Sequence, residues 1–181
     1  MEKKYKLTEE TINIGGTALY RIEALRDFGD VKKGDKGGFI EKEENLSQSD
    51  NCWVYGNAKV CDNAMVYGNA KVYGNARVCD NVWVNCKVQV CGCAEVFGKA
   101  KICGDAVITS NSDYIVFKNW WSSGRYFTWT RSNNMWKVGC FHGTGKELIE
   151  KAYKDSELSG REYERVVKYV ESIIADNGKD K

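Results

Sequence analysis

Apolar side chains recur at every sixth position through the middle of this 181-residue chain. Neither the turn of an α-helix nor the alternation of a long strand produces a period of six. Pairs such as Gly56-Asn57 and Asp62-Asn63 lie between the repeats and favour turns. We therefore expect short strands separated by corners, with two apolar series facing one interior. The first series comprises Val54, Val60, Val66, Val72, Val78, Val84, Val90, Val96, Ile102 and Ile108, and the second comprises Ala58, Ala64, Ala70, Ala76, Val82, Val88, Ala94, Ala100 and Ala106.

This uninterrupted period over residues 46–111 resembles the hexapeptide-repeat left-handed parallel β-helix. In that family three hexads form one triangular coil of eighteen residues, so side chains eighteen positions apart stack in ladders. The position after the aliphatic residue departs from the family pattern, because it often holds Tyr or Cys. Large apolar side chains on an outer face usually mark an interface, although a half-solvated sheet face also tolerates aromatic residues. Because proteins with this helix are often homotrimers, the resemblance implies a homotrimer, with a subunit contact through Tyr55, Tyr73, Trp83 and Phe97.

The two flanks lack the hexad and predict separate caps. Residues 1–45 contain a strand-like stretch at 17–28 and glycine turns at 31–41, which favours an N-terminal β cap over the first coil. Residues 112–181 contain three strand patterns, at 113–121, 124–130 and 135–141, followed by two helix-start motifs at Thr144 and Ser159. The predicted fold is therefore mainly β: a left-handed parallel β-helix with an N-terminal β cap and a small C-terminal β-β-β-α-α domain.

Charge and composition exclude several classes of protein. The 27 basic and 25 acidic residues are spread evenly, which argues against a dedicated DNA or RNA surface. The chain shows neither a signal peptide nor a membrane span, so we expect a cytoplasmic protein that does not bind membranes. Eight cysteines and one histidine form no paired zinc motif, so we expect no metal and no cofactor. Cys61 and Cys79 lie one coil apart and are close enough to oxidise, but we expect reduced thiols.

The C-terminal domain contains the candidate ligand-binding residues. Arginine and tryptophan together can grip and stack a nucleotide, although tryptophan also builds the core of small domains. The stretch from His142 to Lys146 resembles a phosphate loop but fails the P-loop pattern, and an ordinary helix cap would explain its glycines. The predicted ligand site comprises Arg125, Trp129, Arg131, Trp136, His142 and Lys146.

Both flanks also resemble a group of hexapeptide-repeat proteins encoded by bacteriophages and prophages. The resemblance is carried by residues 18–47, 51–60 and 127–153, and it spans nearly the whole chain. It implies a non-catalytic accessory protein in the bacterial host cytoplasm, with an anti-defence role. Such a protein would sequester a nucleotide signalling molecule or block a host effector protein.

The alternative function is a hexapeptide-repeat acyltransferase that uses acyl-coenzyme A, because this is the commonest activity of proteins with this helix. Those enzymes use a histidine base beside the coil, often with a loop inserted into the helix. Here the coils contain neither a loop nor a histidine, and His142 in the appended domain is the candidate base. A carbonic-anhydrase-like enzyme needs three histidines per site, and a polymerising structural protein conflicts with caps at both ends.

Overall fold

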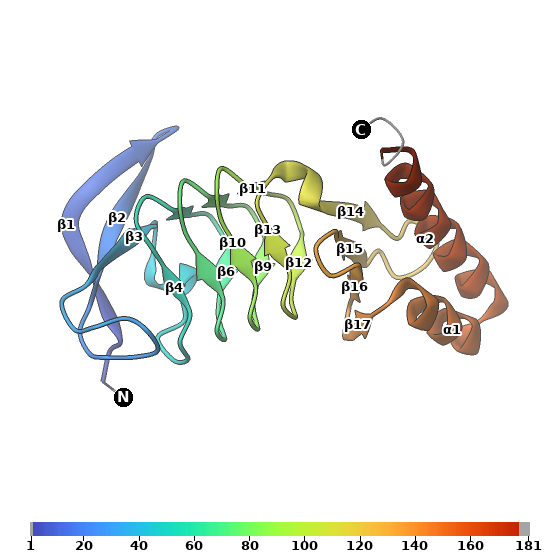
Figure 1. Cartoon of the computed structure of the whole chain (residues 1–181), viewed down its shortest axis with the longest axis horizontal. Helices are drawn as coiled ribbons and strands as arrows, with labels where there is room; N and C mark the ends of the chain where they lie inside the picture. The colour runs from blue at the N-terminus through green and yellow to red at the C-terminus, as the bar shows by residue number, and fades with distance from the viewer. Residues whose placement is uncertain (1, 178–181) are drawn as a thin grey trace.

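A computed structural model describes residues 2–177 and shows an elongated molecule with three successive parts (Figure 1). The N-terminal strands lie at one end, the stacked coils occupy the middle, and two helices lie at the other end. The mainly β fold, with its parallel β-helix and two C-terminal helices, is as predicted. Among the described residues, neither helix is long and apolar enough to cross a lipid bilayer.

Three parallel sheets of two-residue strands form the faces of the β-helix. Neighbouring strands on a face are eighteen residues apart, as when Val60 pairs with Val78. One face has the order β13-β10-β7-β4, the second contains β5-β8-β11, and the third has the order β12-β9-β6. The strands are β4 (Trp53–Val54), β5 (Lys59–Val60), β6 (Met65–Val66), β7 (Lys71–Val72), β8 (Arg77–Val78), β9 (Trp83–Val84), β10 (Gln89–Val90), β11 (Glu95–Val96), β12 (Lys101–Ile102) and β13 (Val107–Ile108).

The two apolar series fill the interior of the coils, as the six-residue period predicts. Every member of both series is at most 1% exposed. The corners depend on backbone with positive φ, which recurs every six residues from Gly56 to Gly104. Most of these corners hold Gly or Asp, which tolerate this conformation better than other residues. Cys86, with φ +59°, adopts the same left-handed conformation without being glycine.

The predicted N-terminal cap extends one face of the helix. Strands β1 (Tyr5–Ile14), β2 (Thr17–Ala24) and β3 (Lys36–Ile40) pair in antiparallel order, and β3 pairs in parallel with β5. A short 3₁₀ helix, η1 (Glu43–Asn45), follows. Trp53 lies under this cap, where Tyr5 and Phe28 pack on its ring and leave it 1% exposed.

A fully buried lysine holds this cap on the first coil. The Lys4 Nζ donates to the carbonyl oxygens of Ser49 at 3.0 Å and Cys52 at 2.9 Å. It also lies 5.0 Å from the centre of the Phe28 ring. Burial lowers the pKa of Lys4, and the neighbouring Cys52 partly opposes this effect. Lys4 therefore supplies hydrogen bonds to backbone carbonyls that would otherwise be buried without a partner.

The C-terminal domain begins after η2 (Asn111–Asp113) and contains four strands rather than the expected three. The third predicted strand divides at Gly139, where φ is +55°. Helix α1 (Gly145–Asp155) begins at the expected capping box, in which the Glu147 amide donates to Thr144 Oγ1. Helix α2 (Glu157–Asn177) begins two residues before the expected Ser159. The antiparallel strands are β14 (Tyr114–Lys118), β15 (Tyr126–Thr130), β16 (Met135–Val138) and β17 (Phe141–Gly143).

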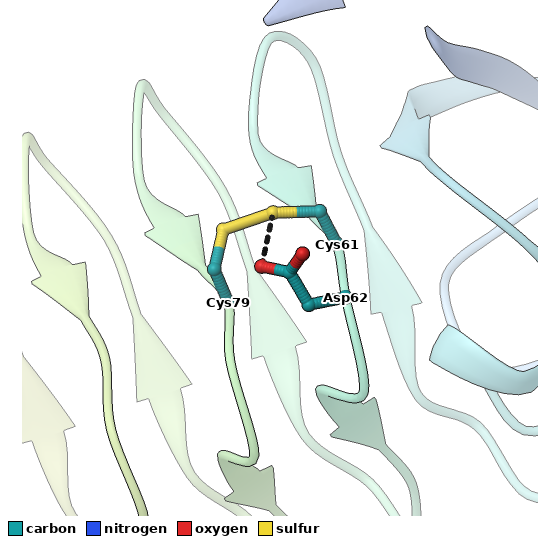
Figure 2. A group of neighbouring side chains, drawn as sticks. All are labelled: Cys61, Asp62 and Cys79. Atoms are coloured by element: carbon teal, nitrogen blue, oxygen red, sulfur yellow. Dashed lines mark hydrogen bonds between the residues drawn. A yellow bond between two sulfur atoms is a disulfide. The ribbon is translucent and has the colours of Figure 1, made fainter. Parts of the chain in front are cut away.

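A disulfide joins Cys61 and Cys79 on adjacent coils (Figure 2). The period of eighteen brings these two residues together, but the expectation that both would be reduced is wrong for the structure described. The outer face that carries the two cysteines exposes less apolar surface than expected, since Leu19 and Phe39 of the cap pack against the disulfide. The free cysteines are Cys52, Cys86, Cys91, Cys93, Cys103 and Cys140.

Candidate functional site

The C-terminal domain is fixed on the last coil by hydrogen bonds to its side chains. The Lys101 amide donates to Thr128 Oγ1 at 2.9 Å, and the Val107 amide donates to Ser132 Oγ at 2.8 Å. Asn133 Nδ2 donates to Asp105 Oδ1 at 3.0 Å. These contacts take the place of a further coil of the β-helix. Without them, the backbone amides at the open end of the last coil would lack acceptors.

Three adjoining cavities surround this contact, and Gly139 lines all three. Their volumes are about 670, 380 and 170 Å³. The largest lies between β17 and the two helices, and the others lie over β9 and β12. We call the three together the junction groove. Its polar and aromatic lining residues include Tyr67, Trp83, Asn85, Lys99, Lys101, Cys103, Arg125, Tyr126, Lys137, Cys140, His142, Lys151, Asp155 and Tyr163.

The junction groove is basic and aromatic. Five lysine or arginine side chains line it against one carboxylate, Asp155, among the described lining residues. The Lys101 Nζ lies 4.3 Å from the centre of the Trp83 ring, and the Lys99 Nζ lies 5.1 Å from that of Tyr126. Trp83 is 41% exposed, so part of its ring is open to a ligand. This arrangement suits an anionic ligand that also carries a planar ring.

His142 lies against the corner of the last coil. It is on β17, where it pairs with Lys137 of β16. A Cβ at Gly104 would lie 2.7 Å from His142 Cε1, which shows how closely the imidazole approaches this corner. The side chain is exposed and lines the largest cavity. His142 is therefore accessible to a ligand and close to the coil at the same time.

An ionised carboxylate lies near His142. The hydrogen bond from Asn133 lowers the pKa of Asp105, and its own backbone amide adds to this effect. The charges of His142 and Lys87 lower this pKa further. Asp105 is thus negatively charged at neutral pH and places a carboxylate close to the imidazole.

The structure brings together two of the six predicted ligand residues. Arg125 and His142 both line the largest cavity. Trp129 and Trp136 are each 2% exposed in the core of the C-terminal domain, so their rings have no free face for stacking. Both tryptophans therefore build the domain core, which was the alternative to a stacking role in a ligand site.

The remaining two predicted residues lie outside the groove lining. Lys146 is exposed on α1, and its Nζ is 4.0 Å from a carboxylate oxygen of Glu150. Arg131 is exposed in the turn after β15. Sequence reasoning did not assign Trp83 and Lys101 to a ligand site, although the period of eighteen places them on one ladder.

The predicted subunit-contact residues differ in exposure. The Tyr55 hydroxyl donates to Asp30 Oδ1 at 2.8 Å, and the Tyr73 hydroxyl donates to Gln89 Oε1 at 2.9 Å. Phe97 is half-buried below the guanidinium of Arg77. Trp83 is the most exposed of the four. The homotrimer and the cytoplasmic location stay predictions.

Comparison with known proteins adds one likeness. No family model matches the chain. The chain is 41% identical over 61 residues to a protein of Escherichia coli (strain K12) named "Uncharacterized acetyltransferase YdcK". The match covers 29% of this chain and 19% of the relative, so the chain spans about a fifth of that protein. Together with the parallel β-helix, this likeness fits a hexapeptide-repeat acyltransferase-like fold.

The likeness corrects the expected function. A non-catalytic phage anti-defence protein, sequestering a nucleotide signal or blocking a host effector, was the main expectation. The match to a protein named as an acetyltransferase contradicts it and favours the alternative.

Proposed function

We propose that this protein is an acyltransferase that uses acyl-coenzyme A and acts in the junction groove. The observation that carries the proposal is the position of His142, the single histidine of the sequence. It lines the largest cavity and lies against the corner of the last coil. The partial likeness to a protein named as an acetyltransferase supports the same activity.

The groove fits coenzyme A in charge and in shape. Coenzyme A carries several phosphate charges and an adenine ring. Lys99, Lys101 and Lys137 line the groove over β9 and β12, and Arg125 lies between the two larger cavities. We assign the phosphates to these cations and the adenine to the open face of Trp83, because cations and aromatic faces bind such groups.

His142 is assigned as the general base. Its neutral imidazole takes the proton from the hydroxyl or amine of the acceptor as that group attacks the thioester carbonyl. The acyl group passes to the acceptor, and the departing thiolate of coenzyme A takes the proton back from the imidazolium. The imidazolium formed between these two steps lies near the negative charge of Asp105. Lys151, Asp155 and Tyr163 line the same cavity and would contact the acceptor.

The test is turnover by the full chain with acetyl-coenzyme A and a panel of amine and hydroxyl acceptors. Released coenzyme A is measured by chromatography, because the free cysteines would react with thiol reagents. We expect His142→Gln to lower kcat about 10²–10⁴-fold while coenzyme A binding, measured by calorimetry, is retained. Arg131→Gln, an exposed change outside the groove lining, is the control.

Two results would overturn the proposal. One is the absence of both turnover and binding heat with acyl-coenzyme A. The other is a His142→Gln protein whose turnover equals that of the wild type.

A further inference from the structure

The disulfide lies in a second group of chemically active side chains, on a different face from the junction groove. Figure 2 shows the carboxylate of Asp62 beside the bonded sulfurs of Cys61 and Cys79. One carboxylate oxygen and the two sulfur atoms all lie within 4.8 Å of one another. Nothing in the acyl-transfer scheme uses these residues.

We infer that, when the disulfide is reduced, Cys61, Cys79 and Asp62 form a binding site for a thiophilic divalent cation such as Zn²⁺. Two thiolates and one carboxylate are common zinc ligands, and a water molecule would complete a tetrahedral site. With zinc–ligand bonds of about 2.0–2.3 Å, ligand atoms lie about 3.3–3.8 Å apart. After reduction, rotation of the side chains would bring the three ligand atoms, now within 4.8 Å of one another, to this spacing.

The surroundings of the site support a bound cation. Arg77 Nε donates to Cys79 Sγ at 3.3 Å, so a positive charge lies beside this sulfur. With the Arg77 guanidinium, two thiolates, one carboxylate and a divalent cation form a neutral group. Charge neutrality matters here because Cys61 and Cys79 are at most 5% exposed.

Two further features shape the site. The Asp80 amide donates to Asp62 Oδ2 at 3.1 Å and orients the carboxylate. Leu19 and Phe39 cover the sulfur side, whereas Asp62 is exposed at the corner. A cation would therefore enter from the Asp62 side and leave the apolar cover in place.

Oxidation state decides whether the site exists, because a disulfide has no thiolate to offer a metal. Reduction by a trialkylphosphine adds two electrons to the sulfur–sulfur bond, and water supplies the two protons and the oxygen of the phosphine oxide. Binding of Zn²⁺ to the two thiols then releases two protons. In a cell, a dithiol reductant would supply the same electrons and protons.

The experiment titrates the full chain with Zn²⁺ without oxygen, in competition with a chromophoric chelator. The phosphine-reduced protein is expected to bind one equivalent tightly, and the oxidised protein is expected to bind none at this site. The Cys61→Ser/Cys79→Ser variant should lose the tight equivalent. Cys93→Ser/Cys140→Ser, which removes two exposed free thiols, is the matched control and should keep it.

Asp62→Asn keeps both thiols and tests the third ligand. We expect its affinity for Zn²⁺ to fall about tenfold or more. Co²⁺ should give a thiolate charge-transfer band in the reduced wild type, and this band should be absent from the Cys61→Ser/Cys79→Ser variant. The proposal is overturned if the oxidised protein binds as tightly, if the control pair loses the metal instead, or if Asp62→Asn has no effect.

Discussion

The ammonium of Lys101 lies 4.3 Å from the centre of the Trp83 ring, and the two residues pair on the adjacent strands β12 and β9. Trp83 is thus an exposed aromatic platform with a cation held at one side. Both residues line the junction groove, in the two cavities that lie over β9 and β12. The contribution of this pair to ligand binding can be measured separately from catalysis.

Lys101→Ala is expected to weaken binding of coenzyme A about fivefold, since one favourable charge contact of about 1 kcal/mol is removed. Calorimetry at low ionic strength measures the effect. Lys59→Ala is the matched control, because Lys59 has the same place in its hexad on another face of the helix. Equal affinities for Lys101→Ala and the wild type would exclude this part of the groove as the phosphate site.

Gly104→Ala is expected to lower kcat at least tenfold by displacing the imidazole of His142. The new Cβ would lie 2.7 Å from Cε1, at the end of a side chain that can rotate away. Small displacements of a catalytic group have large effects on rate.

Gly98→Ala provides the control for backbone strain. Gly98 has φ +76° and Gly104 has φ +78°, but no atom lies within 4 Å of a Cβ at Gly98. Both changes should lower the free energy of unfolding by about 1 kcal/mol, and only Gly104→Ala should affect kcat. A similar loss of kcat in both variants would count against a role for the His142 contact.

Lys4→Met is expected to lower the free energy of unfolding by about 3 kcal/mol, measured by urea denaturation. The substitution keeps a long side chain but leaves the carbonyls of Ser49 and Cys52 without their donor. Lys3→Met, which removes an exposed ion pair with Glu43, should change stability by less than about 1 kcal/mol. If the two variants unfolded at the same urea concentration, Lys4 would not hold the cap.

Cys103 is expected to react slowly with iodoacetamide at neutral pH. Burial raises the pKa of its thiol to about 11, although Lys137 opposes this effect. Mass spectrometry of labelled peptides should show that the exposed Cys93 and Cys140 react first. Rapid labelling of Cys103 in the folded protein would contradict this burial.

The same thiol links stability to pH. Its folded pKa of about 11 is raised above that of an unfolded cysteine, about 8.5. Its stabilising contribution is therefore complete below the unfolded pKa and is lost as the pH rises through the folded one. Cys103→Ser should show a smaller loss of stability over this alkaline range than the wild type.

The β-helix could be predicted from the sequence because its contacts follow a fixed separation. Val60 pairs with Val78 for the same reason that Met65 pairs with Trp83, so the period alone determines which residues meet. The disulfide shows the limit of this reasoning. The separation predicts that Cys61 and Cys79 are neighbours, but their oxidation state does not follow from it.

The candidate site was harder to predict because it forms between parts without a common period. Strand β15 is buried on both sides: Trp129 packs in the domain core, and Thr128 accepts a hydrogen bond from the last coil. Simple alternation of polar and apolar residues therefore does not indicate which side chains of β15 reach a ligand. The position of His142 also depends on how the C-terminal domain packs on the last coil.

The repeat makes the length of the protein adjustable in units of one coil. Inserting eighteen residues between Val66 and Val84 would leave every ladder in register and would move the cap away from the C-terminal domain by about 4.8 Å. An insertion of six residues would instead move every downstream strand to the next face of the β-helix. An insertion after Tyr67 would separate that residue from Trp83 and Asn85, which line the groove from the next coil. The cysteine pair would likewise survive only an insertion that kept Cys61 and Cys79 on neighbouring coils.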